Sequence, residues 1–276
     1  MTGPGAASRT AAGGLTGMVL GPLLGADLHR PRLTVYGLDG ARTELSTASL
    51  ANWSAKVAGL LADELGVRPG DRVSVLLPAG WQTAPVLFGA WWVGAVLTGV
   101  DDPDAVAAFV ADGSDAAAEE VFVVSGHPLG APSRTVAAHQ RDFTTAVLPQ
   151  ADRFAAGANL RQGDPVLCPA DRPDTPLVLA DLAAATATAA AQLGPGPRLL
   201  SDRPWTFPDG LVTNLLGPLA AGGSLVQVPE GSGTKAAAAA GAPDPTAVAA
   251  AERVSLTQGP VVAGVDALPG SPAARG

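Results

Sequence analysis

The sequence has 276 residues, of which 47% are hydrophobic, 15% are charged and one is a cysteine. This length and composition allow a sizeable core, and they exclude a wholly disordered chain and a small disulfide scaffold. The formal net charge of −8, with no local basic stripe, argues against nucleic-acid binding because an acidic surface repels phosphate. The lone Cys168 has no partner for a disulfide within the chain, which predicts a reducing, cytoplasmic location.

Two apolar segments resemble membrane signals. Residues 11–26 follow Arg9 as the centre of a signal peptide would, but several glycines and a proline dilute the run. Residues 73–100 carry no charge and are long enough to cross a bilayer, yet prolines and glycines divide them. We therefore expect a short helix in the first segment and a strand, a buried helix and another strand in the second. A signal peptide and a membrane span are the alternatives, and we predict no membrane association.

Hydrophobic periodicity predicts alternating elements in the first half of the chain. Strands are expected at 33–36, 73–77, 95–100 and 121–124. Helices are expected from Ser46 or Thr47 to Gly66, at 83–93 up to Gly94, and from Asp102 to about Val110. Short connections between fully apolar strands and helices indicate a parallel sheet that is covered on both faces.

The second half continues in the same way. Expected strands are 166–168, 198–201, 224–228 and 254–257, and expected helices are 177–193, 209–221 and 246–251. Asp142 begins a further short helix, and residues 231–243 read as a low-complexity linker. The predicted fold is α/β, with two lobes of mostly parallel sheet flanked by helices. The expected division is a tail and short helix at 1–30, lobes at 31–145 and 146–260, and a disordered tail at 261–276.

Several motifs occur in a fixed order in the first lobe. Residues 44–46 read ELS before a helix, residues 66–73 read GVRPGDRV, and Leu77-Pro78 follows. Residues 89–96 then read GAWWVGAV, ahead of DDP at 101–103. In this order and spacing the motifs resemble the N-terminal domain of the adenylate-forming superfamily, which includes acyl-CoA synthetases, peptide-synthetase adenylation domains and luciferases.

The second lobe continues this resemblance. Residues 163–165 read GDP before a strand, like the start of the family's phosphate loop, and residues 204–210 read PWTFPDG, like its P-L-x-H-x-x-G motif. The resemblance covers residues 33–257, half of a complete member. It implies the fold of the first part of the N-terminal domain of AMP-forming synthetases. In an active member it implies ATP-dependent formation of an acyl or aminoacyl adenylate.

The segment that corresponds to the phosphate loop has the wrong chemistry for a triphosphate. Adenylation concentrates negative charge at a phosphate, so it needs backbone N–H groups and cations around that group. Residues 169–176 read PADRPDTP, with neither glycine nor lysine, and prolines offer no N–H. Arg172 is the only cation there, and Phe207 stands where the family has a histidine. The sequence also ends before the family's adenine- and ribose-binding motifs and its catalytic lysine. We therefore assign no catalytic residue.

Other candidate residues carry little signal. Gly231-Ser232-Gly233-Thr234-Lys235 has the residue types of a phosphate loop but not the spacing, so a linker is the simpler interpretation. The three histidines and the cysteine show no metal-ligand spacing, and we predict no metal site. The resemblance places Trp205, Phe207 and Asp209 in the cleft that binds the acyl group. The alternative is a structural role for them, as a hydrophobic staple and, for Asp209, a helix N-cap.

The sequence thus predicts a truncated, degenerate relative of AMP-binding enzymes that lacks adenylation activity and acts as a binding or regulatory pseudoenzyme. Its expected ligand is a small acyl compound or a nucleotide, while cofactor and protein partner stay open. Two alternatives remain. One is an ATP-dependent acyl- or aminoacyl-adenylate-forming ligase, of the acyl-CoA synthetase type, completed by another chain. The other is a structural partner subunit.

Overall fold

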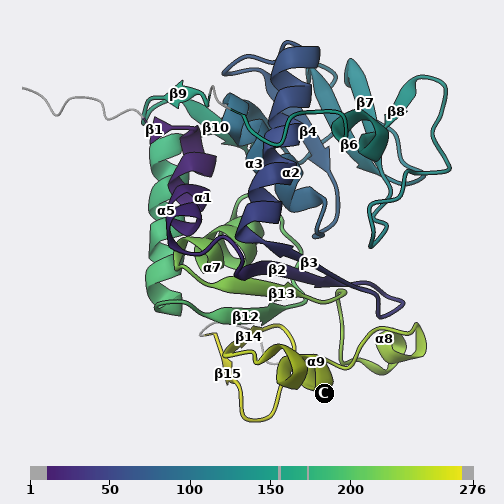
Figure 1. Cartoon of the computed structure of the whole chain (residues 1–276), viewed down its shortest axis with the longest axis vertical. Helices are drawn as coiled ribbons and strands as arrows, with labels where there is room; N and C mark the ends of the chain where they lie inside the picture. The colour runs from purple at the N-terminus through teal and green to yellow at the C-terminus, as the bar shows by residue number, and fades with distance from the viewer. Residues whose placement is uncertain (1–10, 155–156, 173, 269–276) are drawn as a thin grey trace, which may run out of the picture.

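A computed structural model describes residues 11–154, 157–172 and 174–268 as two β-sheets with a layer of helices between them (Figure 1). The first sheet has the spatial order β11 (Leu177–Val178), β10 (Pro165–Cys168), β5 (Val96–Thr98), β4 (Arg72–Leu76), β6 (Ala107–Ala111), β7 (Glu120–Val124) and β8 (Gln140–Asp142). The second has the order β15 (Asp266–Ala267), β14 (Leu256–Gln258), β12 (Arg198–Ser201), β13 (Ser224–Gln227), β2 (Pro31–Tyr36) and β3 (Arg42–Ser46).

Both sheets are parallel except for one antiparallel pair at an edge, β10–β11 in the first and β2–β3 in the second. The predicted fold class is therefore confirmed. The sheets do not follow the predicted lobe boundary in sequence, because β10 and β11 join the first sheet while β2 and β3 join the second. A separate two-stranded ladder pairs β1 (Ala11–Ala12) with β9 (Asn159–Leu160).

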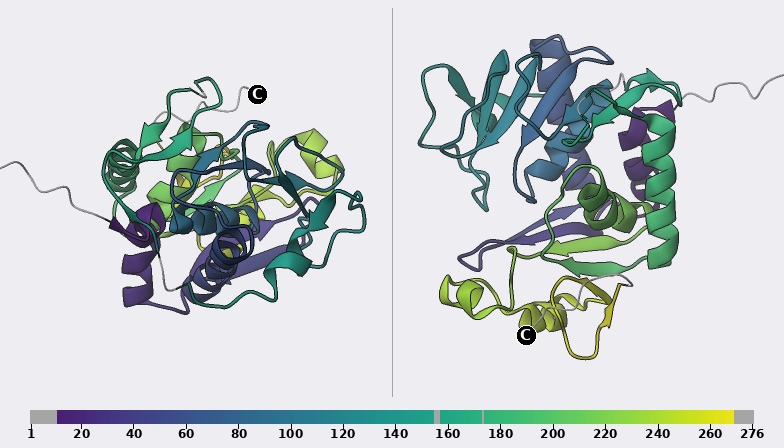
Figure 2. Two further views of the ribbon diagram at one scale, coloured as in Figure 1. Left: turned by 90° about the horizontal axis from the view of Figure 1, so that it is seen from above. Right: turned by 180° about the vertical axis from the view of Figure 1, so that it is seen from behind.

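The helices between the sheets share one hydrophobic core with both of them. This layer contains α1 (Gly14–Ala26), α2 (Thr47–Gly59), α3 (Thr83–Val93), α4 (Phe143–Val147), α5 (Leu179–Leu193), α6 (Asp209–Leu211) and α7 (Gly217–Ala220). Two π-helical turns, η1 (Leu60–Glu64) and η2 (Val212–Leu216), extend α2 and connect α6 to α7. On the other face of the second sheet lie α8 (Lys235–Ala239) and α9 (Pro245–Glu252), seen again from behind in Figure 2.

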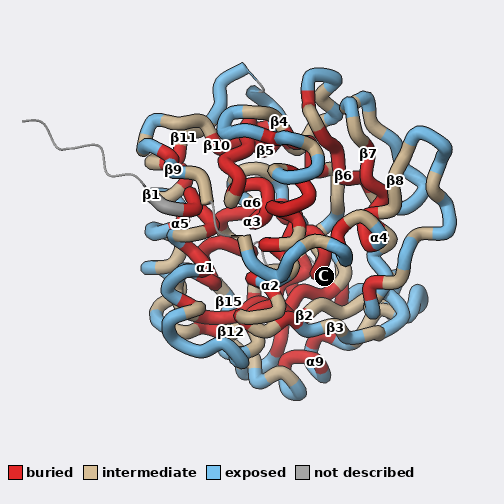
Figure 3. Tube along the Cα trace, turned by 45° about the horizontal axis from the view of Figure 1, so that its top comes forward, coloured by how far each residue is buried: buried red, intermediate tan, exposed pale blue. Residues whose placement is uncertain are grey.

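Local signals explain where the central helices begin and end. The Ser46 hydroxyl accepts a hydrogen bond from the Ser49 N–H at 3.1 Å, which is an N-cap for α2. Gly94 ends α3 with φ 86°, a conformation that favours glycine. The body of α3 is buried on all sides, as the red central segments of Figure 3 show. Burial explains why this segment carries no charge. Within the described ranges, no helix is both long and apolar enough to cross a membrane.

Three segments differ from the predictions. Residues 103–110 contain a turn and then β6 instead of a helix, because β6 pairs with strands on both sides. Asp102 caps that turn, with its Oδ1 accepting the Asp104 N–H at 3.0 Å and its Oδ2 bound to Arg72 at 3.0 Å. The expected linker at 231–243 includes α8, and the expected disordered tail includes β15. The last eight residues of that tail lie outside the described ranges.

The helices α2 and α3 approach each other closely at Gly89. A Cβ at this position would lie 2.6 Å from the Val57 Cβ and 2.8 Å from the Ser54 carbonyl oxygen. These distances are shorter than any ordinary van der Waals contact, and one of the clashing atoms belongs to the backbone. The glycine is therefore required for the two helices to pack at this distance.

We predict that Gly89→Ala lowers the free energy of unfolding by about 1–3 kcal/mol, because the new methyl group overpacks the α2–α3 contact. The matched control is Gly25→Ala in α1, where nothing beyond its chain neighbours lies within 4 Å of the added Cβ. There the greater helix propensity of alanine should raise stability by about 0.5–1 kcal/mol. Urea unfolding of both variants measures the two effects, and equal stabilities would contradict the proposed packing constraint.

An ionic cluster around the buried Glu252 carboxylate ties α9 to the second sheet. The Glu252 carboxylate, which is 8% exposed, accepts hydrogen bonds from Arg42 on β3, Arg198 on β12 and the Tyr36 hydroxyl on β2. Burial opposes ionisation of Glu252, but hydrogen bonds from Arg42, Tyr36 and Arg198 together lower its pKa from 4.5 to about 2. The carboxylate therefore stabilises the folded state only when it is ionised.

Because the folded-state pKa is lowered, this stabilisation is present above pH 4.5 and is lost as the pH falls toward about 2. We predict that Glu252→Gln lowers the free energy of unfolding at neutral pH by about 1–2 kcal/mol, less than the full pKa shift implies because solvent screens the exposed Arg42, and reduces its dependence on pH in that window. Chemical denaturation at several pH values tests this prediction. A variant that loses as much stability on acidification as the wild type would show that Glu252 is not responsible.

Candidate functional site

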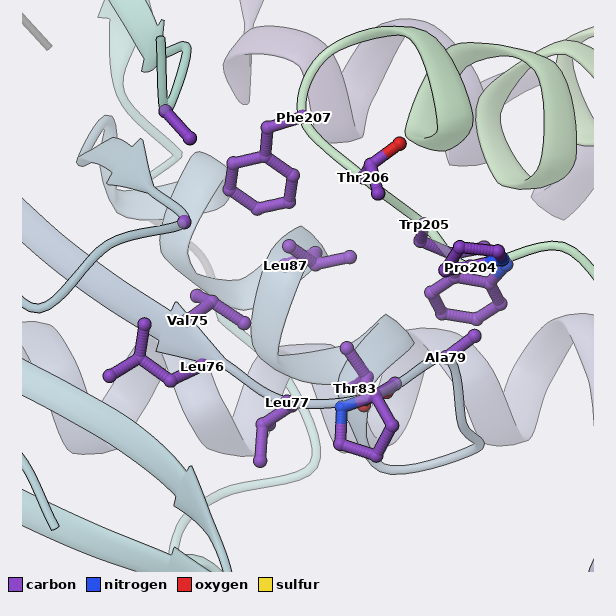
Figure 4. A pocket seen from close by; sticks show the side chains of 13 residues that line it. Val75, Leu76, Leu77, Ala79, Thr83, Leu87, Pro204, Trp205, Thr206 and Phe207 are labelled. Carbon is purple, nitrogen blue, oxygen red and sulfur yellow. The ribbon is translucent and has the colours of Figure 1, made fainter. Parts of the chain in front are cut away.

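A cleft of about 350 Å³ lies at the carboxyl edge of the first sheet (Figure 4). We call it the first-sheet cleft. Its walls come from the end of β4 and the residues after it, from Gly99 after β5, from Ala170 after β10, from α3, and from residues 204–207 ahead of α6. Open parallel sheets bind ligands at this edge, where the loops leave the strands. All side chains that line the cleft are uncharged, and most are apolar.

Trp205 is fixed at one wall of this cleft. It is 6% exposed, and its Nε1 donates a hydrogen bond to the Gln227 Oε1 at 3.2 Å. The Gln227 amide in turn donates to the carbonyl oxygens of Arg203 and Val228. The loop before α6 is thereby attached to the end of β13. The Trp205 side chain faces the first sheet, but its position depends on a hydrogen bond to the second sheet.

Phe207 lies across the cleft from β4. A Cβ added to Gly99 would be 3.3 Å from the Phe207 Cδ2, so the ring packs directly on the backbone after β5. Phe207 and Trp205 come from one loop and line one cleft. At the position where the resemblance places the family's histidine, this chain has the apolar Phe207 ring, which contacts the end of the neighbouring strand.

Asp209 lies away from this cleft. It is the first residue of α6, with Pro208 in the N-cap position, so it occupies the first turn and not the cap. It lines a different cavity of about 310 Å³, together with Asp181 and Leu182 of α5 and Val212 of η2. The structure therefore brings together two of the three predicted site residues.

Among the described residues of the segment at 169–176, no polar side chain lines the cleft. The Arg172 and Thr175 N–H groups donate to the carbonyl oxygens of Pro169 and Arg172, so both are used within the loop. The Arg172 side chain is 58% exposed and lies 3.5 Å from the Asp171 carboxylate. Ala170 is the loop's contribution to the cleft wall, and Pro173 lies outside the described ranges.

The remaining sequence candidates lie in separate places. Lys235 is exposed at the start of α8, a helix that the Thr234 hydroxyl caps. His139 contacts the Asp115 carboxylate at 3.0 Å on the surface, and the His127 Nδ1 accepts the Leu129 N–H at 3.1 Å. In the part of the chain that the structure describes, no group of three or more acidic, histidine or cysteine side chains has the geometry of a metal site.

Sequence reasoning missed most of the cleft wall. Gly99, Leu87 and Thr83 line it, yet each reads in the sequence as part of an ordinary apolar segment. The sequence signal that could have identified these residues was their position relative to the strands. Gly99 and Leu77 both follow a parallel strand directly, and parallel strands bring their carboxyl ends to one edge. The predicted strands 73–77 and 95–100 run slightly past the observed strand ends, so both residues fall within the last two positions of a predicted strand.

Known proteins resemble this chain in sequence and in fold. A family model described as AMP-binding enzyme matches residues 28–156. A Mycobacterium tuberculosis protein described as a TIGR03089 family protein is 44% identical over 224 residues, which cover 78% of this chain and 89% of that protein.

Solved synthetases share the fold. An acyl-CoA synthetase from Brucella canis superposes with a TM-score of 0.72 at 17% identity, over 92% of this chain and 48% of the synthetase. An anthranilate CoA ligase in complex with anthranoyl-AMP gives 0.70 at 16% identity, over 89% of this chain and 49% of the ligase. Acetoacetyl-CoA synthetase from Streptomyces lividans gives 0.68 at 18% identity, over 89% of this chain and 42% of that enzyme.

The chain thus spans about half the length of these solved synthetases, and it matches the mycobacterial protein over most of both sequences. The family model and the superposed synthetases agree with the family that the motifs of the first lobe predict. The chain belongs to the same family as the mycobacterial protein and is a partial member of the adenylate-forming superfamily of AMP-binding enzymes.

Proposed function

We propose that this chain is a binding module for an apolar acyl-type ligand and that its 276 residues do not carry out adenylation by themselves. The observation that carries the proposal is the uncharged wall of the first-sheet cleft, closed by Trp205 and Phe207. Apolar clefts of this size hold small organic ligands, and the buried apolar area supplies most of the affinity. The ligand of the anthranilate CoA ligase, anthranoyl-AMP, supports an acyl compound as the chemical class.

The arrangement of residues 169–176 supports the second part of the proposal. Stabilising the charge of a phosphoryl transition state requires donors that point at the phosphate in a site shielded from water. Here Arg172 is exposed and paired with Asp171, and two of the loop's N–H groups are used in turns. The rival function is an ATP-dependent acid ligase whose remaining active-site groups come from outside these residues. Asp209 keeps its predicted binding role only if the ligand extends toward α5.

We expect octanoate and octanoyl-CoA to raise the melting temperature of the protein, because a ligand that binds only the native state stabilises it. ATP–pyrophosphate exchange with octanoate should stay at the level of a blank without protein. Robust exchange by this chain alone would contradict the proposal and establish the ligase. No stabilisation by either acyl compound, together with no exchange, would favour a structural subunit.

Phe207→Ala tests the location of the ligand. Removing the ring takes apolar contact from the cleft and should weaken octanoate binding about tenfold or more in calorimetry. The matched control is Phe154→Ala, since Phe154 is also partly buried but packs on Trp92, away from the cleft. Equal affinities for octanoate in the two variants would place the ligand elsewhere.

Trp205→Phe tests the attachment of the loop. The change removes the indole N–H and leaves the Oε1 of the 3%-exposed Gln227 without its donor. A buried acceptor without a partner costs about 1–2 kcal/mol, and we expect that loss in urea unfolding. Octanoate affinity should fall less than in Phe207→Ala, because the ring itself is kept. Unchanged stability would show that the hydrogen bond to Gln227 does not hold the loop.

A further inference from the structure

A second cleft, of about 420 Å³, lies at the carboxyl edge of the second sheet. We call it the second-sheet cleft. Its lining residues follow three adjacent parallel strands, β12, β13 and β14, or begin α9. They include Asp202, Arg203, Ser232, Asp244 and Gly259. In contrast to the first-sheet cleft, most side chains here are polar or charged.

The connections between the strands change from one face of the sheet to the other at this cleft. The chain leaves β12 through α6 and α7, on the face toward the first sheet, to reach β13 on one side. It leaves β13 through α8 and α9, on the opposite face, and crosses to β14 on the other side of β12. The loops after the adjacent strands β12 and β13 therefore leave the sheet on opposite faces. Ligands of open α/β sheets bind in the crevice that such a change of direction creates.

Asp202 is the buried charged group of this cleft. Its residue surface is 8% exposed, and its Oδ2 accepts the Gly231 N–H at 3.2 Å. Its Oδ1 has no hydrogen-bond partner among the described residues, since the nearest cation, the Arg203 Nε, is 3.6 Å away. A Cβ on Gly259 would lie only 1.8 Å from this Oδ1, so glycine is needed for the carboxylate to sit here. A buried carboxylate oxygen without a donor is costly and requires an explanation.

The other polar groups of the cleft mainly offer acceptors. The Ser232 hydroxyl donates to the Pro229 carbonyl at 2.6 Å, which leaves its oxygen lone pairs free. The Asp244 oxygens accept the Thr246 and Ala247 N–H groups and keep further acceptor capacity. The two carboxylates against the single Arg203 leave the lining with a net negative charge. An anionic ligand is disfavoured, and a ligand rich in donors and positively charged is favoured.

A metal ion does not fit these groups as well as an organic cation does. Hard cations in proteins are held by several carboxylates and carbonyls at once, and no such acidic cluster is found among the described residues. Arg203, which is 39% exposed, already sets a guanidinium beside the Asp202 carboxylate without completing a hydrogen bond. An ammonium group supplies three N–H donors on a compact charge and can take that place.

We propose that the second-sheet cleft binds a small primary ammonium compound, with the ammonium group donating to the Asp202 Oδ1 in place of the Arg203 guanidinium. The Asp244 carboxylate adds electrostatic attraction, and the Ser232 oxygen adds a further acceptor. This site is separate from the first-sheet cleft and does not depend on the function proposed for it.

The test is a titration of the full chain with ethylammonium chloride, in which NMR measures binding. We expect saturable binding to the wild type. Asp202→Asn, which keeps the shape but removes the charge, should weaken it at least about tenfold, as loss of a charge-assisted hydrogen bond does. Arg203→Gln should strengthen it, because a competing cation is removed. These opposite changes are not expected from a general loss of folding. The matched control is Asp266→Asn, an exposed acid on β15, which should leave affinity unchanged.

Tetramethylammonium and magnesium chloride complete the experiment. Tetramethylammonium has the same charge but no N–H donor, so it should bind much more weakly than ethylammonium. Equal binding of the two would overturn the proposed hydrogen bond, and tighter binding of Mg²⁺ than of ethylammonium would replace the site by a metal site. Lack of saturable ethylammonium binding by the wild type, or equal binding by Asp202→Asn, would also overturn the proposal.

Discussion

The close contact of α2 and α3 at Gly89 lies in the helical layer on which both sheets pack. A side chain at Gly89 would clash with Val57 and with the Ser54 backbone of α2, so the two helices can lie this close only with glycine there. Leu87 and Thr83 of α3 line the first-sheet cleft, so the same helix that packs on α2 also forms one of its walls. A change in the α2–α3 distance would therefore move this wall relative to Trp205 and Phe207.

The interleaving of the chain gives this packing its functional consequence. Trp205 follows β12 of the second sheet in the sequence, and it is hydrogen-bonded to Gln227 at the end of β13. Its side chain nevertheless lines the cleft at the edge of the first sheet. Conversely, β10 belongs to the second half of the sequence but pairs with β5 in the first sheet, and the chain then continues into α5. The cleft is a product of both sheets, and neither half of the sequence contains all of it.

Periodicity and capping residues were sufficient to predict most elements but not their assembly. Ser46, Gly94 and Asp142 act locally, through a hydrogen bond or a backbone angle, and so their positions could be read from neighbouring residues. Asp102 shows the limit of this approach. Its side chain caps a turn as it would cap a helix, and only the pairing of β6 with β4 and β7 decides that a strand comes after that turn. Likewise, no local signal indicated that Asp209 would face α5 and not the cleft.

The two clefts illustrate how one architecture can be given different chemistry by the residues after its strands. Both lie at carboxyl edges of parallel strands, where backbone geometry favours a ligand whatever the side chains are. After β4, β5 and β10 those residues are apolar or turned to solvent, which suits a hydrophobic group and gives phosphate no shielded cation among the described residues. After β12 the residue is a buried carboxylate, which repels phosphate directly. A retained fold does not by itself establish the superfamily's reaction, since the charges around a bound ligand are set by the residues that follow the strands.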